Sequence, residues 1–440
     1  MKNKVGKIIF LIVMVAVTVG YLYFIRPLVD DELFNYGFSY NILNGLVPYK
    51  DFNMIITPFF NYILAFILAV MGKRLIVYHL VIALIIVGVF GMSYKLIGGG
   101  AFVLYLLMLI FPYIGYNTFA LGLLFCLFYI KGKKNEEIWE AIIISMMFLT
   151  KQTLGLMVIP SLIFSKNRKK TFLIYLVSCL GFLLFLILTG ATGKFFDYCL
   201  FGLFDFADKN STGINLFAIA EVVIILGLSY YSYKLKDKEI MFCLMFQVVT
   251  LPIINYYHFT TSFVPVVYLL FKYFKNKSYF FLFTMTAMIL CFCCFNFLLF
   301  MLGDAYVTLT YYGKDNFMKG RVVGRFMEPV IDETAEFIER YDGYDVYYFG
   351  FLAYLTKLNL DIPINKYDLI NNGNMGYKGK DKYIAEVDSN CKINKCLIFI
   401  NDYIGENSDT LQVNKDILEY VKNNYTSIRG SNVCSVYINR

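Results

Sequence analysis

The sequence predicts a polytopic α-helical membrane protein that ends in a small extracytoplasmic α/β domain. Of its 440 residues, 59% are hydrophobic and only 16% are charged, a balance that excludes an ordinary soluble protein. Several apolar runs approach the roughly 20 residues that a helix needs to cross a bilayer. After Gly303 the sequence changes to alternating helix-like and β-like segments, as in α/β domains. We therefore assign residues 1–302 to a membrane domain and residues 303–440 to a soluble domain.

The basic residues determine the expected topology. The net charge is +8, but the lysines and arginines cluster between apolar runs, which indicates the positive-inside rule and argues against nucleic-acid binding. Three lysines precede the first run, residues 8–25, and predict a cytoplasmic N-terminus. This run lacks a small-residue cleavage site, so we expect a retained anchor. The rule predicts about 11 crossings of the cell membrane, with the loop 26–54 and the tail after Gly303 outside.

The next runs are less regular. Residues 55–71 are expected to cross back to the cytoplasm at Lys73 and Arg74, and residues 75–92 to cross outward again. Residues 101–130 are apolar but interrupted by a Pro-containing segment. We interpret them as one broken crossing, because basic residues follow; two half-crossings are the alternative.

A tight hairpin is expected over residues 138–150 and 154–164, with Lys151 and Gln152 at its outer tip. The remaining crossings are expected at residues 171–189, 214–231, 240–254, 263–271 and 280–302.

The cysteines and histidines argue against a zinc enzyme. Most of the ten cysteines lie in or beside apolar runs, where they act as small apolar side chains, and only two histidines are present. The tail contains three cysteines, so at most one bridge forms there. Cys391 and Cys396 are the expected pair, leaving Cys434 free, because an outer compartment permits oxidation.

The most informative stretch is the acidic motif at residues 30–32, directly after the first run. Carboxylates are costly near hydrocarbon, so these three belong in the wet interfacial layer. Phe34, Phe38 and Ile42 then recur with the spacing of one helix face. We predict a short amphipathic helix along the membrane surface, with its acids at the positive end of the helix dipole.

This loop resembles the first extracytoplasmic loop of the GT-C glycosyltransferases that use polyprenyl-phosphate sugars, the protein O-mannosyltransferase and aminoarabinose transferase relatives. The matching positions are, in order, Asp31-Glu32, Asn44-Gly45, Pro48-Tyr49-Lys50-Asp51 and Thr57-Pro58. Elsewhere the likeness is only a general multispan pattern. The resemblance implies transfer of a sugar from a polyprenyl phosphate to an extracytoplasmic glycan, lipid or protein of a bacterial cell envelope.

Such a transfer needs a carboxylate to accept the proton of the incoming hydroxyl. The resemblance assigns this general base to Asp31, with Glu32 beside it as a helper. Asp30 and Glu32 are possible ligands of a divalent metal, Mg or Mn. The alternative is that the three acids only solvate the start of a helix.

The departing phosphate needs positive charge, for which Lys151 and Lys50 are the candidates. A lysine inside an apolar hairpin is costly unless it meets an anion such as a lipid phosphate. The alternative is that Lys151 reaches for headgroups. Lys50 occupies the basic position of the matched loop, and its alternative is a solvated loop cation.

Further candidates for substrate contact are Tyr49, Asp51, Asn117, Gln152 and His258. His258 belongs equally well to an interfacial aromatic cluster, and Asn117 could cap the backbone of a broken helix.

Two other functions remain open at this point. A flippase or transporter of lipid-linked glycans predicts ionisable residues at mid-span, often near inverted repeats. Only Lys151 and Glu221 fit that description, and neither recurs in a repeat. A non-catalytic scaffold of envelope assembly with the same fold is disfavoured by the intact acidic motif.

Overall fold

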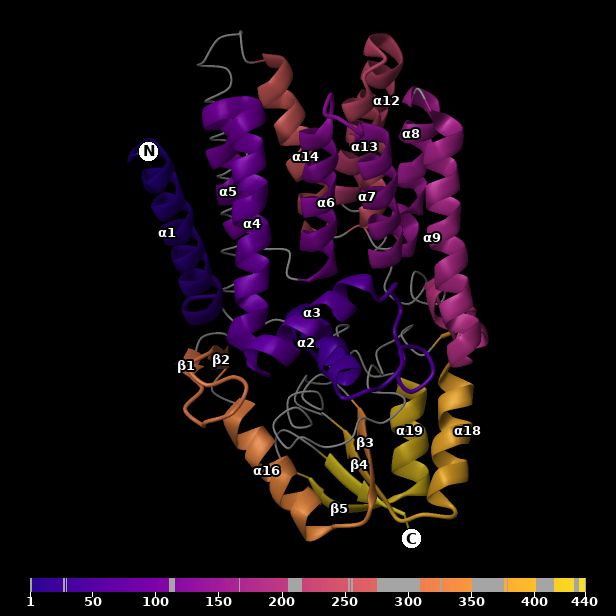
Figure 1. The fold of residues 1–440 in the computed structure, drawn as a ribbon. Helices are drawn as coiled ribbons and strands as arrows, with labels where there is room; N and C mark the ends of the chain where they lie inside the picture. The colour runs from indigo at the N-terminus through magenta and orange to yellow at the C-terminus, as the bar shows by residue number, and fades with distance from the viewer. Residues whose placement is uncertain are drawn as a thin grey trace.

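The computed structural model describes most of the membrane domain and about three fifths of the tail. The described residues are 2–26, 28, 30–110, 115–165, 167–204, 216–251, 254, 256–274, 309–324, 327–349, 376–377, 379–400, 415–430 and 435–439. They form a body of roughly aligned helices with an α/β lobe at one end (Figure 1). Among these residues, four helical stretches are long and apolar enough to cross a membrane: Val5–Phe24, Leu75–Leu109, Arg168–Thr189 and Leu216–Leu235.

Three of these stretches are apolar but poorly buried. The first belongs to α1 (Lys2–Phe24), and the others are α9 (Arg168–Thr189) and α12 (Leu216–Leu235). Exposed side chains such as Ile12, Leu183 and Val223 line them. Contiguous apolar surface of this extent is what a helix presents to lipid.

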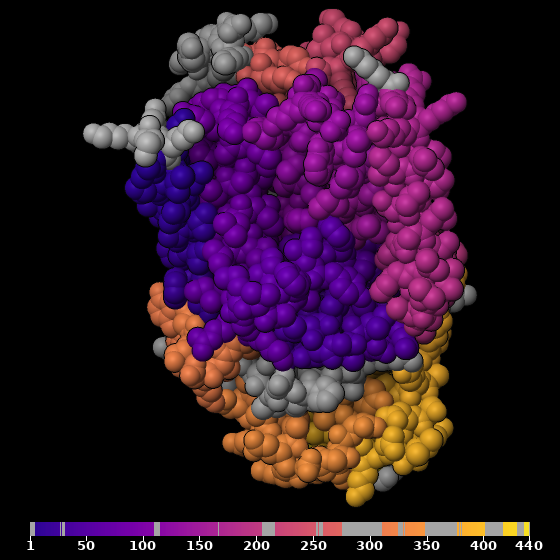
Figure 2. Space-filling model, viewed as in Figure 1, coloured from indigo at the N-terminus to yellow at the C-terminus, as the bar shows by residue number. Residues whose placement is uncertain are grey.

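Helices α2 (Asp30–Leu43) and α3 (Phe59–Met71) lie across the lower end of the body. They pack together through Asn61, whose Nδ2 donates to the Asn35 carbonyl at 3.0 Å and to Ser39 Oγ at 3.2 Å. Figure 2 shows this indigo region covering the lower part of the body, above the orange and yellow tail. The helix expected after residue 30 is thus present, but Leu33, Tyr36, Phe38 and Tyr40 are all buried, so it packs on nearly every side. The prediction that it is an amphipathic helix lying along the membrane surface is wrong.

The prediction that residues 55–71 return to the cytoplasm is wrong. Helix α3 has 13 residues, and at about 1.5 Å per residue it is shorter than the hydrocarbon core. Arg74 lies 4.0 Å from Asp315 of the tail, and the Leu75 amide donates to the Phe317 carbonyl at 2.9 Å. Lys73 bonds Asn44 at 3.0 Å. Residues 73–75 therefore lie on the same face as α2 and the tail.

Residues 101–130 form two helices, and the start of the first and the finish of the second lie at the same end of the body: Gly100 lies against Phe271, and Lys131 and Lys272 both pair with Glu239. The prediction of one broken crossing is therefore wrong, and the alternative of two half-crossings fits the structure. Helix α4 (Leu75–Ile97) ends at the short turn η1 (Gly98–Gly100), and α5 (Ala101–Ile110) packs back beside it. Gly98 has φ +65°, which glycine adopts readily at a helix end. Helix α6 (Tyr116–Ile130) follows as a separate element. The intervening segment 111–114 lies outside the described residues.

The hairpin predicted around Lys151 is confirmed. Helix α7 (Glu136–Thr150) leads to Lys151, and η2 (Gln152–Met157) and α8 (Val158–Phe164) follow. Helix α9 then matches the expected crossing at 171–189. The later elements are α10 (Thr192–Phe196), η3 (Asp197–Phe201), α12, α13 (Lys238–Phe246), η4 (Gln247–Thr250) and α14 (Tyr256–Phe274). The crossing predicted at 280–302 falls outside the described residues.

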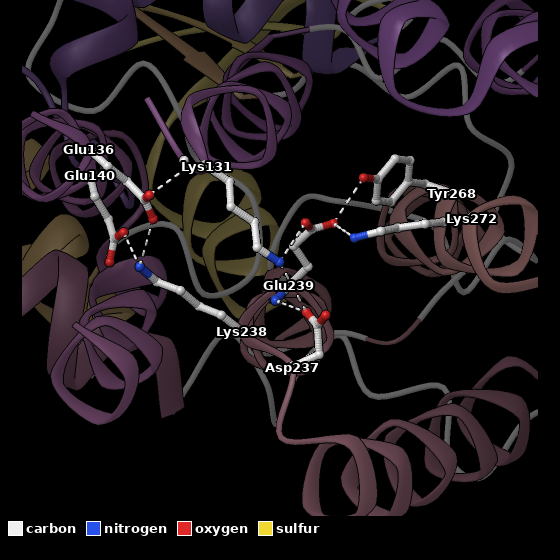
Figure 3. Close-up of polar contacts among 9 residues, drawn as sticks. Lys131, Glu136, Glu140, Asp237, Lys238, Glu239, Tyr268 and Lys272 are labelled. Atoms are coloured by element: carbon white, nitrogen blue, oxygen red, sulfur yellow. Dashed lines mark hydrogen bonds and ion pairs between the residues drawn. The ribbon is translucent and has the colours of Figure 1, made fainter. Parts of the chain in front are cut away.

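At the end of the body remote from α2, lysines and carboxylates form a closed set of ion pairs (Figure 3). Glu239 accepts from Lys131 at 2.9 Å, from Lys272 at 2.6 Å and from the Tyr268 hydroxyl at 2.9 Å. Lys238 pairs with Glu136 at 3.3 Å and also with Glu140. We call these residues, with Asp237, the lysine–glutamate cluster; it joins the α6–α7 loop to α13 and α14.

The tail begins with an antiparallel hairpin, β1 (Leu309–Tyr311) and β2 (Val322–Gly324). Beyond it, a sheet has the order β3 (Asp345–Phe349), β4 (Cys396–Ile400), β6 (Ser435–Ile438) and β5 (Thr426–Gly430). Strands β3 and β4 are parallel, and the other pairs are antiparallel.

Alternate residues of β4 face opposite sides of this sheet. Ile398 and Ile400 belong to a cluster with α18 (Gly379–Cys391) and α19 (Lys415–Asn424). Leu397 and Phe399 belong to a second cluster, with Phe337 of α16 (Met327–Arg340). Cys391 and Cys396 form the expected disulfide, which ties α18 to β4. Cys434 is not among the described residues.

Candidate functional site

The two acids of the matched pair lie in the first turn of α2 but have opposite surroundings. Glu32 is fully buried. Its Oε1 lies 2.6 Å from His79 Nε2 and 3.3 Å from Arg321 Nε, and its Oε2 lies 3.1 Å from Arg321 Nη2. Burial raises the pKa of Glu32, but Arg321 and then His79 outweigh it and lower the pKa to about 2. Glu32 is therefore an ionised residue whose two oxygens are both held by the Arg321 guanidinium, with the His79 ring beside one of them.

Asp31 remains exposed, and its carboxylate makes no hydrogen bond or ion pair within the described part of the chain. The surrounding protein nevertheless excludes part of the water around the Asp31 carboxylate. This desolvation raises the pKa of Asp31, and the charges of Arg26 and Lys151 offset only part of the rise. Asp31 is thus an accessible carboxylate with an increased affinity for a proton.

Lys151 is buried at the tip of the hairpin, where α7 ends in an extended conformation. Its Nζ donates to the Val249 carbonyl at 2.6 Å and lies 5.7 Å from the centre of the Tyr116 ring. Its charge acts on both Asp31 and His258. An ammonium has three N–H donors, and one hydrogen bond from this amine is found among the described residues. The remaining donors are available to an anion.

Tyr116 and Asn117 reach the same place because α6 begins close to α2. Gly115 has φ +113°, and a Cβ there would lie 2.4 Å from Nδ2 of Asn35. Only glycine permits this approach. The Tyr116 hydroxyl bonds Asn117, and Asp31 acts on Tyr116 electrostatically. The Asn117 Oδ1 is buried without a hydrogen-bond partner in the described structure.

Gln152 ties three segments together beside Lys151. Its Nε2 donates to the Ile55 carbonyl at 2.8 Å and to the Cys199 carbonyl at 3.0 Å. Its Oε1 is buried and accepts no hydrogen bond from the residues that the structure describes. The structure therefore brings together Asp31, Lys151, Gln152, Asn117 and His258.

The Pro-Tyr-Lys-Asp run builds its own loop instead of joining this group. Tyr49 is buried with φ +68°, and its hydroxyl donates to the Ile56 carbonyl at 2.6 Å. The Asp51 carboxylate accepts from the Val47 amide at 2.7 Å. Lys50 is exposed. Substrate contact by these three residues stays a prediction.

The predicted metal site also stays a prediction. The side chain of Asp30 is not described. Both oxygens of Glu32 are occupied by contacts with Arg321 and His79, an arrangement that does not fit a metal ligand. Within the described ranges, no group of three or more His, Cys, Asp or Glu side chains is arranged to hold a metal ion.

Sequence reasoning missed three residues of this region: Tyr78, His79 and Arg321. The Tyr78 hydroxyl is buried without a hydrogen-bond partner among described residues, and both Asp31 and Glu32 act on it electrostatically. A histidine in an otherwise apolar run was a usable signal for His79. Arg321 lies in the tail, 289 residues from Glu32, and its local sequence contains no comparable signal.

Among solved structures, the chain is similar to the aminoarabinose transferase ArnT from Cupriavidus metallidurans. The apo form gives a TM-score of 0.61 at 10% identity, covering 100% of this chain and 98% of that one. This chain has the GT-C fold. ArnT bound to undecaprenyl phosphate gives a TM-score of 0.58 at 10% identity, covering 99% of this chain and 98% of that one.

The archaeal oligosaccharyltransferase AglB from Archaeoglobus fulgidus gives a TM-score of 0.47 at 11% identity, covering 100% of this chain and 74% of that one. No family model and no curated protein matches the sequence. The fold that the resemblance in the first outer loop implied is confirmed by the two ArnT structures, which cover 99% and 100% of this chain.

Proposed function

We propose that this GT-C protein is a membrane glycosyltransferase that moves a sugar from a polyprenyl phosphate to the hydroxyl of an extracytoplasmic acceptor. The observation that carries the proposal is the exposed Asp31 carboxylate, which has no partner among the described residues, near the buried Lys151 amine. A solved structure with this fold contains undecaprenyl phosphate. The acceptor is a glycan, lipid or protein of the cell envelope.

In the proposed reaction, the acceptor oxygen attacks the anomeric carbon as its hydroxyl proton passes to Asp31. The bond between that carbon and the phosphate oxygen breaks, and the polyprenyl phosphate leaves with the electron pair. A raised pKa makes Asp31 a stronger base than an ordinary aspartate. Lys151 offers N–H donors to the phosphate and balances the charge that develops on it.

Hydrogen-bond acceptors beside Lys151 suit the sugar of the donor. Gln152 Oε1 and Asn117 Oδ1 are buried acceptors without partners among the described residues, and sugar hydroxyls are donors. Both atoms belong to segments that adjoin Lys151 and Tyr116. We assign the sugar to this side of the site.

The proposed topology places the Asp31 end and the tail outside the cell membrane and the N-terminus in the cytoplasm. The contacts of residues 74–75 with the tail, and of Glu32 with Arg321, put the acidic motif and the tail on one face. Lysines gather at the remote end of the helices, as the positive-inside rule requires of a cytoplasmic face.

The test is a transfer assay in membranes with a panel of labelled polyprenyl-phosphate sugars and cell-envelope acceptor fractions. Wild type should transfer one of these sugars. Asp31→Asn keeps the shape but removes the proton acceptor, and turnover should fall by about 10²–10⁴ while donor binding persists. Asp342→Asn is the matched control, because Asp342 is an exposed carboxylate between α16 and β3 and belongs to none of the candidate site residues.

Normal transfer by Asp31→Asn would refute the assignment of the base. Movement of the labelled lipid across vesicles without sugar transfer would favour the transporter alternative. Neither activity with any donor would favour the scaffold.

A further inference from the structure

Arg321 of the tail is completely buried against the membrane domain, an unusual place for an arginine. It stands directly before β2, where the β1–β2 loop meets the turn between α1 and α2. Its backbone is held on both sides, because its amide donates to Met318 at 2.9 Å and its carbonyl accepts from Tyr312 at 2.9 Å. The guanidinium therefore projects from a fixed turn.

The guanidinium bonds both sides of the turn that leads to the acidic motif. Nη1 donates to the Tyr23 carbonyl at 2.9 Å and to the Arg26 carbonyl. Nε and Nη2 donate to the two oxygens of Glu32 at 3.3 and 3.1 Å. Carbonyls at a helix end lack partners of their own. One planar group thus joins the end of α1 to the start of α2, which a lysine with its point charge cannot reproduce.

The rest of the β1–β2 loop supports the same contact. The Leu28 amide donates to the Val322 carbonyl at 3.3 Å, and the Tyr23 hydroxyl donates to the Lys319 carbonyl at 2.7 Å. The Leu75 amide donates to Phe317, so the start of α4 is included. The tail therefore contacts the turn, the helix before it and the helix that contains His79.

Asp31 and Glu32 are neighbours on α2, so their side chains point about 100° apart around the helix. Fixing Glu32 toward the tail fixes the rotation of this first turn, and with it the direction of Asp31. Without Arg321, Glu32 would be a buried carboxylate that retains His79 as its near partner. Rotation of the turn would then become favourable, because it would expose the Glu32 carboxylate to water.

We propose that Arg321 is a positioning residue for glycosyl transfer, and that the tail completes the site by holding the acidic helix from outside. This inference rests on the proposed function. Arg321 acts through Glu32 and the turn and does not touch substrate.

A second tail contact provides a matched control. The Lys382 amine lies 3.0 Å from both oxygens of Asp197, and the Tyr377 amide donates to Asp197 at 3.1 Å. Half of the Lys382 side chain is exposed. This contact joins tail and membrane domain without contacting the α1–α2 turn.

The experiment compares Arg321→Gln, Arg321→Lys and Lys382→Gln in the full-length protein, with single-turnover transfer and donor affinity measured for each. Arg321→Gln should lower kcat by about 10²-fold, the loss expected from a small misplacement, with little change in KM for donor. Arg321→Lys should recover only part of this loss, and Lys382→Gln should resemble wild type.

Two further measurements separate positioning from folding. The double variant Glu32→Gln with Arg321→Gln removes both buried charges and should transfer faster than Arg321→Gln alone. Modification of Asp31 by a water-soluble carbodiimide, measured by mass spectrometry, should change in rate in Arg321→Gln but not in Lys382→Gln. This measurement needs no activity, so it remains decisive if wild type transfers no tested sugar.

Unchanged transfer and unchanged Asp31 modification in Arg321→Gln would overturn the proposal. Equal losses in Arg321→Gln and Lys382→Gln would also overturn it, because the tail would then matter only as a whole.

Discussion

The two ends of the helical body use the same residue types in opposite ways. In the lysine–glutamate cluster, Lys131, Lys238 and Lys272 each lie within ion-pair distance of a carboxylate (Figure 3). At the other end, Lys151 and Asp31 interact through their charges but make no ion pair. A closed set of pairs satisfies its charges and holds helices together. An open pair leaves both charges available to a ligand, as active sites require.

Lys151→Met should give the largest effect in this comparison. The change removes the charge and keeps much of the apolar stem. Donor affinity and transfer should fall together, because the phosphate loses its counter-charge in both the ground state and the transition state. A charge-assisted hydrogen bond contributes about 1.5–3 kcal/mol, which corresponds to about 10- to 100-fold.

Donor binding is measured with labelled polyprenyl phosphate, and the control is Lys134→Met at an exposed position of the α6–α7 loop. The open-pair interpretation fails if Lys151→Met binds donor as wild type does, which would leave Lys151 as a lysine that reaches for headgroups.

Glu239→Gln should have the reverse effect. It removes a carboxylate that accepts from two lysines and a tyrosine, so the thermal unfolding temperature should fall. The expected loss is on the order of 1–3 kcal/mol, since both lysines are partly exposed. Transfer per folded molecule should not change.

Unfolding in detergent, followed by the fluorescence of a thiol dye, measures this loss. Glu137→Gln is the control, because Glu137 makes no ion pair in the part of the chain described. A fall in kcat with Glu239→Gln at unchanged stability would contradict the division between the two ends.

A change in pH should affect Asp31 and Glu32 in different pH ranges. Near neutrality, its effects should be smaller than those of the two substitutions. The pKa of Asp31 is raised, so transfer should decline as pH falls through that raised value. The pKa of Glu32 is lowered from 4.5 to about 2, so the stability that it contributes is present above pH 4.5 and lost as pH falls toward 2. Asp31 has the opposite sign, because its raised pKa means that the folded protein ionises it less readily than the unfolded chain does. The stability that it contributes at low pH is therefore lost as pH rises from its ordinary pKa to the raised one.

On acidification, transfer should therefore stop before the tail separates from α2. The measurements are the transfer rate and the rate of protease cleavage within the tail, each followed against pH. Arg26, Lys151, Tyr78 and Tyr116 also face Asp31, and Asp31→Asn serves as the reference for their titration. If transfer and the tail contact were lost at the same pH, the two measurements would report a single event, contrary to this prediction.

Local patterns were sufficient to predict the membrane body, the existence of the helix after residue 30 and the hairpin around Lys151. The spacing of Phe34, Phe38 and Ile42 predicted α2, and a lysine between two apolar runs predicted the hairpin. The ordered loop motif predicted the GT-C fold. Each of these signals lies within a few tens of residues, where helix periodicity and desolvation cost act directly.

The failures share a different cause. Lys73 and Arg74 satisfy the positive-inside rule by composition, but they bond Asn44 and Asp315, which sequence order does not bring together. Arg321 was missed for the same reason, since Glu32 lies far from it in the chain. Partner choice over such separations depends on the packed fold, and no local pattern encodes it.

The long separation between Glu32 and Arg321 also has a consequence for synthesis. A ribosome makes the chain from its N-terminus, so Glu32 emerges 289 residues before its arginine. From the synthesis of His79 until that of Arg321, the nascent acidic helix has the histidine but not the guanidinium, and its final rotation is set last. The order of translation thus delays completion of the site until nearly three quarters of the chain exists, and a chain that stops early inserts its helices without acquiring an aligned Asp31.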